Sequence, residues 1–106
     1  MFLEATDGTI FGPVIVAERF GERFRGLRPR AAGRYLLLPT NSVHGFGMRE
    51  PIWAAGLSDT MTVTQVAIVA PRRVITLRGA VWILEGPVTA PRPVVGATLV
   101  RTEVQR

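Results

Sequence analysis

One short, continuous apolar run is central to the expected fold: Tyr35-Leu36-Leu37-Leu38-Pro39. Such a run, followed by a proline, predicts a buried strand. Other β candidates surround it, and turn signals such as Ser58-Asp59-Thr60 and Gly79 separate them. These candidates are Thr9-Ile10-Phe11, Val14-Ile15-Val16, Val43–Met48, Ile52–Leu57, Met61–Val69, Arg73–Arg78, Ala80–Leu84 and Thr98–Val104.

One helix is expected near the N-terminus, from Ala17 to Leu27. Phe20 and Phe24 recur with Leu27 at i, i+4 and i+7, which makes one apolar stripe. Pro29 forbids continuation of the helix. The sequence therefore predicts an α+β fold, mostly β, in which this helix packs on a compact small sheet or barrel-like domain.

Length and composition predict one domain, residues 1–106, because a chain of 106 residues with 47% hydrophobic residues can bury a single core. The absence of cysteine excludes disulfides, thiolate metal sites and a cysteine nucleophile. The stretch Met1–Gly8 lacks the basic end and apolar run of a signal peptide. No apolar run approaches the ~18 residues that span a bilayer. We therefore expect a cytoplasmic protein without a transmembrane segment.

The charge of the chain is arginine-rich and locally concentrated. Thirteen basic residues, all arginines, and 8 acidic residues give a formal net charge of +5. Such a charge favours acidic partners, including nucleic acid. The alternative is a solvated basic face, and Phe20 and Phe24 have core spacing rather than the exposure needed to stack on bases. The basic patch comprises Arg19, Arg23, Arg25, Arg28, Arg30 and Arg34.

Two segments carry a resemblance to a known family: Glu22-Arg23-Phe24-Arg25-Gly26-Leu27-Arg28-Pro29-Arg30 and Ser42-Val43-His44-Gly45-Phe46-Gly47-Met48-Arg49-Glu50-Pro51-Ile52. Their "ER..GL..R" and "H.FGMR.PI" patterns resemble the DUF192 family, small bacterial and archaeal domains of no known function. Ala80–Glu85 looks like the family's "A..VLE" strand, and Val95–Leu99 resembles its "VGD.L". The motif residues are Glu22, Arg23, Gly26, Leu27, Phe46, Gly47, Met48 and Pro51.

This chain departs from the family pattern at two positions. The pattern expects an aspartate after Pro51-Ile52 and another after Gly96, but Trp53 and Ala97 stand there. The resemblance thus implies a divergent member in which a polar site has been lost or repurposed. A tryptophan in place of a charge adds a large apolar surface that must be buried or used in a contact.

A candidate pocket for a ligand or anion involves His44, Arg49 and Glu85. His44 is the single histidine, and Arg49 follows it in the same motif, where a guanidinium could hold an anion in a bidentate manner. Structural roles, such as an ion pair of Arg49 with Glu50 or Glu85, are the alternative. A mixed site of His44, Asp59 and Glu85 has no recognisable ligand spacing, so we predict no metal and no cofactor.

No nucleophile–base pair and no paired-carboxylate pattern is recognisable, so a catalytic role is not the leading expectation. The leading hypothesis is a non-catalytic small domain that binds a protein partner, an assembly or a small ligand, with Trp53 and Trp82 as candidate contacts. The first alternative is electrostatic binding of nucleic acid through Arg19–Arg34. The second is a weak enzyme or anion pocket around His44 and Arg49. The sequence does not indicate an oligomeric state.

Overall fold

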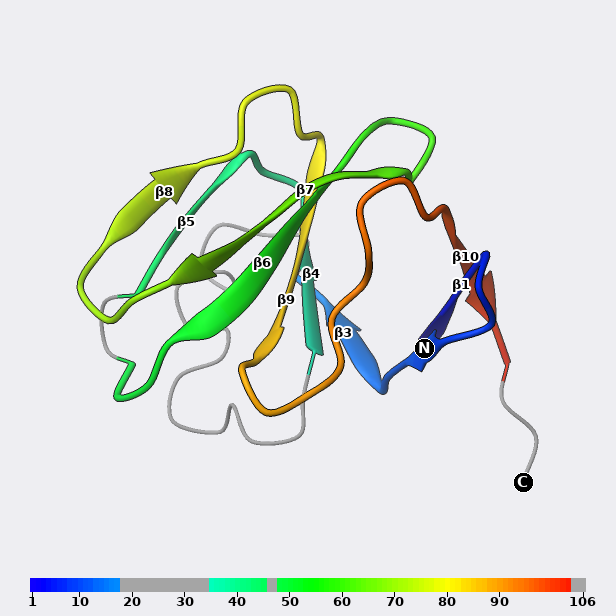
Figure 1. Ribbon diagram of the computed structural model, residues 1–106, viewed down its shortest axis with the longest axis horizontal. Coiled ribbons are helices and arrows are strands. Elements are labelled where there is room, and N and C mark those ends of the chain that lie inside the picture. Colours follow the sequence, from blue (N-terminus) through cyan, green and yellow to red (C-terminus); the bar gives the residue numbers. More distant parts are fainter. Residues whose placement is uncertain (18–34, 46–47, 104–106) are drawn as a thin grey trace.

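The computed structural model describes residues 1–17, 35–45 and 48–103. Within these ranges every regular element is a β-strand. The strands are β1 Phe2–Ala5, β2 Ile10–Phe11, β3 Val14–Val16, β4 Tyr35–Leu38, β5 Ser42–His44, β6 Ile52–Leu57, β7 Val63–Val69, β8 Val74–Thr76, β9 Trp82–Pro87 and β10 Leu99–Thr102. They form three sheets, with the strand orders β10-β1-β2, β3-β4-β9-β6-β7 and β5-β8 (Figure 1).

The prediction of an α+β fold is wrong, because the described residues are all β and none of them is helical. The predicted helix lies outside the described residues except for its first residue, Ala17. The Ala17 N–H donates a hydrogen bond to the carbonyl oxygen of Leu37 at 2.9 Å. Ala17 therefore continues the parallel pairing of β3 with β4. The predicted strands Val14–Val16 and Ile52–Leu57 are confirmed with the same bounds, and the other predicted strands are confirmed in shortened or shifted form. β1 is a strand that the sequence pattern does not predict.

The five-stranded sheet is the centre of the structure because its inner strands are buried on both faces. Every residue of β4 and β6 is buried. Successive side chains of a strand point to opposite faces, and along β6 they enter two different apolar clusters in turn. Trp53 and Ala55 belong to the first cluster, whereas Ile52 and Ala54 belong to the second.

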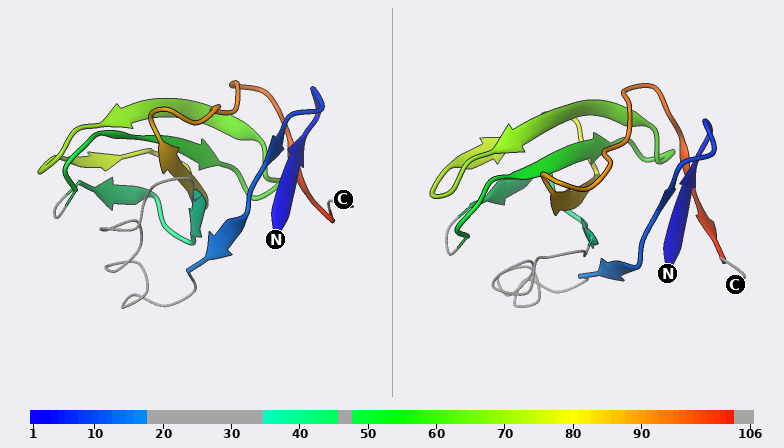
Figure 2. Two further views of the ribbon diagram at one scale, coloured as in Figure 1. Left: turned by 90° about the horizontal axis from the view of Figure 1, so that it is seen from below. Right: turned by 60° about the horizontal axis from the view of Figure 1, so that its bottom comes forward.

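The two clusters, here called the first core and the second core, are covered by different small sheets. The three-stranded sheet β10-β1-β2 contributes to the first core, and the ribbon β5-β8 packs on the second core. Figure 2 shows β1 and β10 at the end of the molecule opposite the β5-β8 ribbon. The first core is Leu3, Ala5, Phe11, Val14, Tyr35, Leu37, Trp53, Ala55, Leu57, Val63, Leu84, Ala97 and Leu99. The second core is Ala17, Leu36, Leu38, Val43, Ile52, Ala54, Val69, Leu77 and Ile83.

An aromatic group forms the middle of the first core. The ring of Tyr35 contacts Phe11 edge-on at 6.0 Å between centroids and Trp53 at 5.9 Å. Trp53 is 0% exposed, and its indole N–H donates to the carbonyl oxygen of Ala90 at 3.2 Å. Trp53 is therefore a core residue with its one polar atom satisfied, as buried tryptophans require. Trp82 is half-buried and packs against the same core.

Gly86 makes room for the Trp53 side chain. These two residues are directly opposite each other in the β6–β9 pairing. A Cβ atom on residue 86 would overlap the indole of Trp53, lying 2.7 Å from Cε2 and 3.1 Å from Cη2. The indole thus fills the space that any larger residue would need at position 86.

No helix among the described residues is long and apolar enough to cross a membrane.

We expect Gly86→Ala to lower the free energy of unfolding by about 1–3 kcal/mol, the usual cost of forcing an extra carbon into a packed core. Urea unfolding of the two proteins measures this difference. The matched control is the same substitution in a Trp53→Leu background, where the atoms that would overlap the new Cβ are gone. A cost that is equal in both backgrounds would show that Trp53 is not the obstacle.

Burial raises the pKa of the Tyr35 phenol above its ordinary value. Because Tyr35 is the single tyrosine, phenolate absorbance during an alkaline titration reports on it alone. We expect a midpoint above about 10 in the folded protein and a return to the ordinary value in denaturant. The folded state prefers the neutral phenol, so this contribution to stability is complete below the unfolded pKa and is lost as pH rises toward the folded one. Identical midpoints in both states would contradict this.

Candidate functional site

The three residues of the predicted pocket come from three different elements. His44 ends β5, Glu85 lies in β9, and Arg49 lies in the connection between β5 and β6. Strand geometry decides which of them can face one another, because directly opposed residues of paired strands share a face.

Glu85 is the buried charged residue of the described part, at 6% exposure. It is directly opposite Leu36 on β4 and Ala54 on β6. Both neighbours belong to the second core, so the Glu85 side chain lies on the second-core face of the central sheet. A carboxylate at such a position costs solvation free energy and is retained only with compensating interactions.

His44 lies on the other face of the β5-β8 ribbon. Its cross-strand neighbour is Val74, which is 64% exposed, whereas the preceding residue Val43 is in the second core. By strand alternation the imidazole of His44, which is half-buried, points away from that core. The fold therefore does not bring His44 and Glu85 to one face. Asp59 is exposed in the β6–β7 turn, and no three potential metal ligands among residues 1–17, 35–45 and 48–103 form a cluster.

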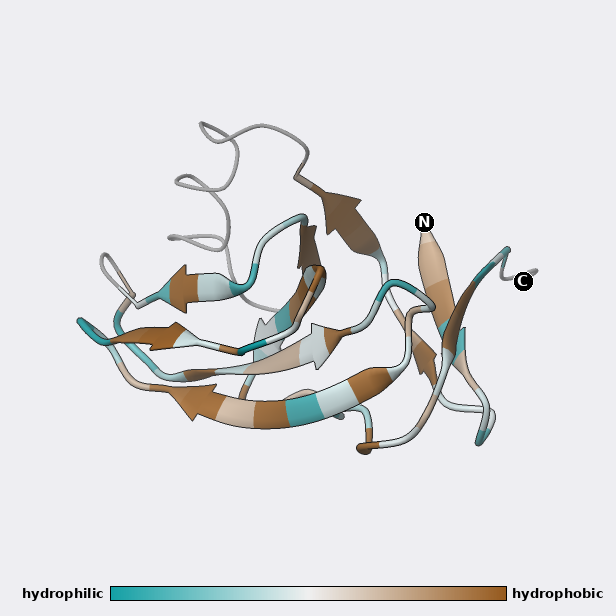
Figure 3. Cartoon of the chain, turned by 90° about the horizontal axis from the view of Figure 1, so that it is seen from above, coloured by the Kyte–Doolittle hydropathy of each residue, from teal (hydrophilic) through white to brown (hydrophobic). Residues whose placement is uncertain are grey.

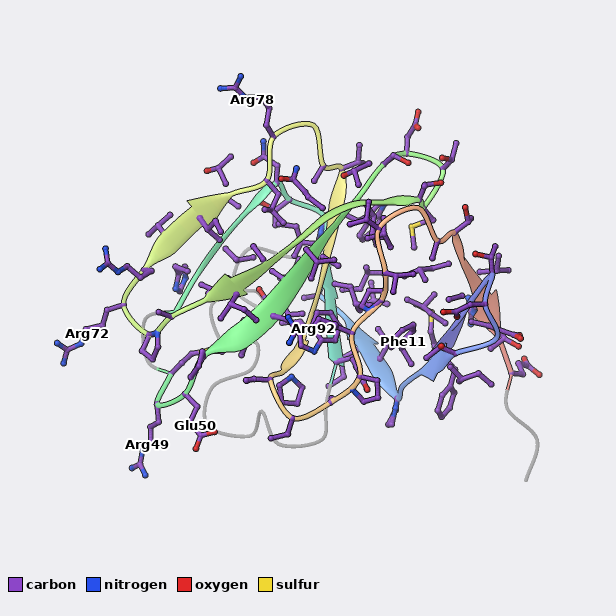
Figure 4. The ribbon with its side chains drawn as sticks, viewed as in Figure 1. Phe11, Arg49, Glu50, Arg72, Arg78 and Arg92 are labelled. Carbon is purple, nitrogen blue, oxygen red and sulfur yellow. The ribbon has the colours of Figure 1, made fainter. Side chains whose placement is uncertain are left out.

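Arg49 joins two arginines that the motif analysis does not single out. Arg49, Arg72 and Arg73 are all exposed. Figure 4 shows Arg49 and Arg72 projecting from the same end of the molecule, with Glu50 beside Arg49. We call the surface formed by Arg49, Arg72 and Arg73 the arginine end. Its only sequence signal is that Pro71-Arg72-Arg73 forms a turn after a long β candidate, and the pairing of that turn with the Arg49 loop is a tertiary feature.

Backbone hydrogen bonds to Gly45 hold the two loops of the arginine end together. The Gly45 N–H donates to the carbonyl oxygen of Arg73 at 2.8 Å, and the Gly45 carbonyl accepts from the N–H of Arg72 at 3.1 Å and of Met48 at 3.2 Å. A Cβ on residue 45 would overlap the Ala70 carbonyl oxygen and lie 3.1 Å from its carbon. Glycine is thus required where the loops approach each other.

Most exposed arginines and most exposed acids of the described residues lie in different halves of the structure, and the exposed Arg92 lies in the connection between β9 and β10. Around the β5-β8 ribbon lie four exposed arginines and one exposed acid: Arg49, Arg72, Arg73, Arg78 and Glu50. The other half contains Arg101 and four exposed acids. The Asp59 turn belongs to that half because the Thr62 and Thr98 hydroxyls are 3.1 Å apart, next to the start of β10. The exposed acids there are Glu4, Asp7, Asp59 and Glu103.

The described part carries equal numbers of arginines and acidic residues. The formal charge of +5 therefore resides in the residues outside the described ranges, chiefly in Arg19–Arg34. The acidic half also contains one ordered carboxylate: hydrogen bonds from Thr9 lower the pKa of the exposed Asp7. One of these bonds is donated by the Thr9 N–H at 3.0 Å.

Several predicted site residues lie outside the described residues: Glu22, Arg23, Gly26, Leu27, Phe46, Gly47 and the basic patch Arg19, Arg23, Arg25, Arg28, Arg30 and Arg34. Of the remaining motif residues, Met48 packs partly buried against the second core and Pro51 is half-buried. Trp53 and Ala97, at the two positions where the DUF192 pattern expects aspartates, both belong to the first core. Here the two positions form part of an apolar interior.

No family model matches the sequence, and no curated protein matches it. Two solved structures share the fold. A protein from Sinorhizobium meliloti 1021, described as a "putative transcription regulator", is 18% identical with a TM-score of 0.70, over 93% of this chain and 89% of the other. A protein of unknown function from Novosphingobium aromaticivorans DSM 12444 is 14% identical with a TM-score of 0.72, over 94% of this chain and 82% of the other. At these identities the likeness establishes the fold alone.

Proposed function

We propose that this chain is a non-catalytic binding domain and that its ligand is the phosphate backbone of a nucleic acid. The observation that carries the proposal is the arginine end, where Arg49, Arg72 and Arg73 are exposed on two loops fixed to each other through Gly45. Arginine side chains bind phosphate oxygens through paired N–H donors. Fixing the loops reduces the conformational entropy lost on binding.

The charge distribution supports the same proposal. The acids of the described part lie mostly in the opposite half, so they do not neutralise the arginine end at close range. The sequence adds a second basic region, Arg19–Arg34, with a large share of the formal charge. The description of the Sinorhizobium relative as a "putative transcription regulator" is compatible with a nucleic-acid ligand.

We also propose that the chain is a divergent member of the DUF192 family, a family of no known function. The location of Trp53 and Ala97 supports this proposal. The family pattern expects aspartates at these two positions, and in this chain both positions lie in the apolar first core. His44 and Glu85, on different faces, are not proposed as one pocket. A small anion such as inorganic phosphate is the alternative ligand for the arginine end.

We expect the variant with Arg49, Arg72 and Arg73 all changed to Gln to bind labelled duplex DNA more weakly than the wild type. Fluorescence anisotropy at several salt concentrations measures both the affinity and its salt dependence. Each lost phosphate contact reduces the magnitude of the slope of log K against log salt by about 0.9. The slope of the triple variant should therefore be smaller in magnitude by roughly 2–3 than that of the wild type. A second triple variant, with Arg23, Arg25 and Arg28 changed to Gln, tests the Arg19–Arg34 region separately.

The matched control changes Arg78, Arg92 and Arg101 to Gln, which removes the same charge at other exposed positions. Equal weakening by this control would show that only net charge matters, and binding that is independent of salt would refute the proposal. If inorganic phosphate displaces the labelled DNA at a concentration equal to that of the DNA nucleotides, the arginine end is better described as a site for a small anion. A His44→Ala variant should fold and bind as the wild type does.

A further inference from the structure

Strand β7 has an edge that is open over most of its length. It is the outermost strand of the central sheet and pairs with β6 on one side. On the other side its first residue, Val63, is engaged: its N–H donates to Ala97 and its carbonyl accepts from Gly96, both at 2.8 Å. Within the part of the chain that the structure describes, no backbone hydrogen bond joins Gln65–Val69 to a neighbour on that side.

The figures agree that nothing lies beyond this edge in the described chain. In the left view of Figure 2, β7 forms the upper border of the molecule, and only the connection between β9 and β10 comes near its beginning. In Figure 3, β7 forms the lower border of the central sheet and is hydrophobic over most of its length. The free edge is thus accessible from Gln65 to Ile68, whereas Val69 at its end is buried.

The composition of β7 makes this edge ready for pairing. Val63–Val69 contains no charged residue and no proline, which are the usual devices that protect an exposed edge. It is rich in β-branched residues, and Ile68 is 47% exposed. An uncharged strand of this kind is a template for another strand.

We propose that the free edge of β7 pairs with the same edge of a second copy of this chain, in antiparallel orientation. Charge at the two ends of the strand selects this partner and this direction. Asp59 is exposed shortly before β7, and Arg72 and Arg73 are exposed shortly after it. Antiparallel self-pairing runs the acidic beginning of each strand toward the basic end of the other, whereas parallel pairing would align like charges.

The available residues also define the register. A pair that uses Gln65–Val69 of both copies centres on Ala67 and places Ile68 beside Val66 of the second copy. The hydrogen bond from the Gly96 N–H to Val63 places Val94 and Val95 next to the start of the free edge. Their side chains are 57% and 63% exposed. The β7–β8 turn of the second copy would cover them. The contact is isologous, so it closes at two copies.

The Asp59 turn is ordered enough to present its charge. The Ser58 hydroxyl accepts hydrogen bonds from the N–H groups of Thr60 at 3.3 Å and Thr62 at 3.2 Å. The Thr60 hydroxyl is 2.9 Å from that of Ser58 and 3.2 Å from that of Thr62. This row of hydroxyls fixes the turn at the beginning of β7.

Single cysteines test the pairing directly, because the chain has no cysteine of its own. In an antiparallel pair the Cα atoms of opposed residues are about 4.5–5.5 Å apart, within the range of a disulfide. We expect Ala67→Cys, at the centre of the register, to form a disulfide-linked dimer much faster than Val100→Cys, on the exposed face of β10. Equal rates for the two variants would overturn the proposal.

Sedimentation equilibrium provides the independent measurement. The wild-type mass should rise with concentration toward twice that of one chain, and Ile68→Lys should hold it at one chain because the register buries the added charge. Val100→Lys is the matched control and should dimerise as the wild type does. Asp59→Arg, an exposed change that leaves the strand intact, should weaken the dimer severalfold. A wild type that stays monomeric at its highest concentration, or a dimer indifferent to both Ile68→Lys and Asp59→Arg, would refute the pairing.

Discussion

Burial of both faces of the strands β4, β9 and β6 is the constraint on which the rest of the structure depends. A sheet with apolar side chains on both faces is stable only when each face is covered, because burial of apolar area is the dominant favourable contribution to folding. The three-stranded sheet and the β5-β8 ribbon provide that cover for the first and second cores. The arginine end follows from the same arrangement, since it forms where the ribbon over the second core meets the end of β7.

The central strands were predictable from sequence because they contain no polar alternation. Tyr35–Leu38 and Ile52–Leu57 are continuous apolar runs, and a strand buried on both faces has this pattern. The fold class was not predictable in the same way. The apolar stripe of Phe20, Phe24 and Leu27 indicates only a local preference for helix, and a local preference cannot establish the class of the whole fold. Strand β1 escaped prediction because its pairing with β10 depends on residues nearly the whole chain away.

The candidate site shows a similar division between local and non-local information. The motif around His44 and Arg49 drew attention to the loop that carries Arg49. However, strand alternation separates His44 from Glu85. This separation cannot be inferred before the registers of β5 and β9 are known. Among the described residues, hydrogen bonds between Gly45 and the backbone of Arg72 and Arg73 hold their turn against the loop that contains Arg49. That contact depends on the pairing of β5 with β8, which two strands, β6 and β7, separate in the sequence, so composition and spacing carry no sign of it.

The close fit of Trp53 against Gly86 has a consequence for the history of the chain. Because the indole occupies the space of a side chain at position 86, the order in which the two residues were acquired matters. A tryptophan arriving at position 53 opposite any larger residue would meet a steric barrier, whereas a glycine arriving first would leave a gap that the indole could then fill. A larger residue at position 86 is therefore tolerated better without tryptophan at position 53 than with it, so the indole makes the glycine difficult to replace.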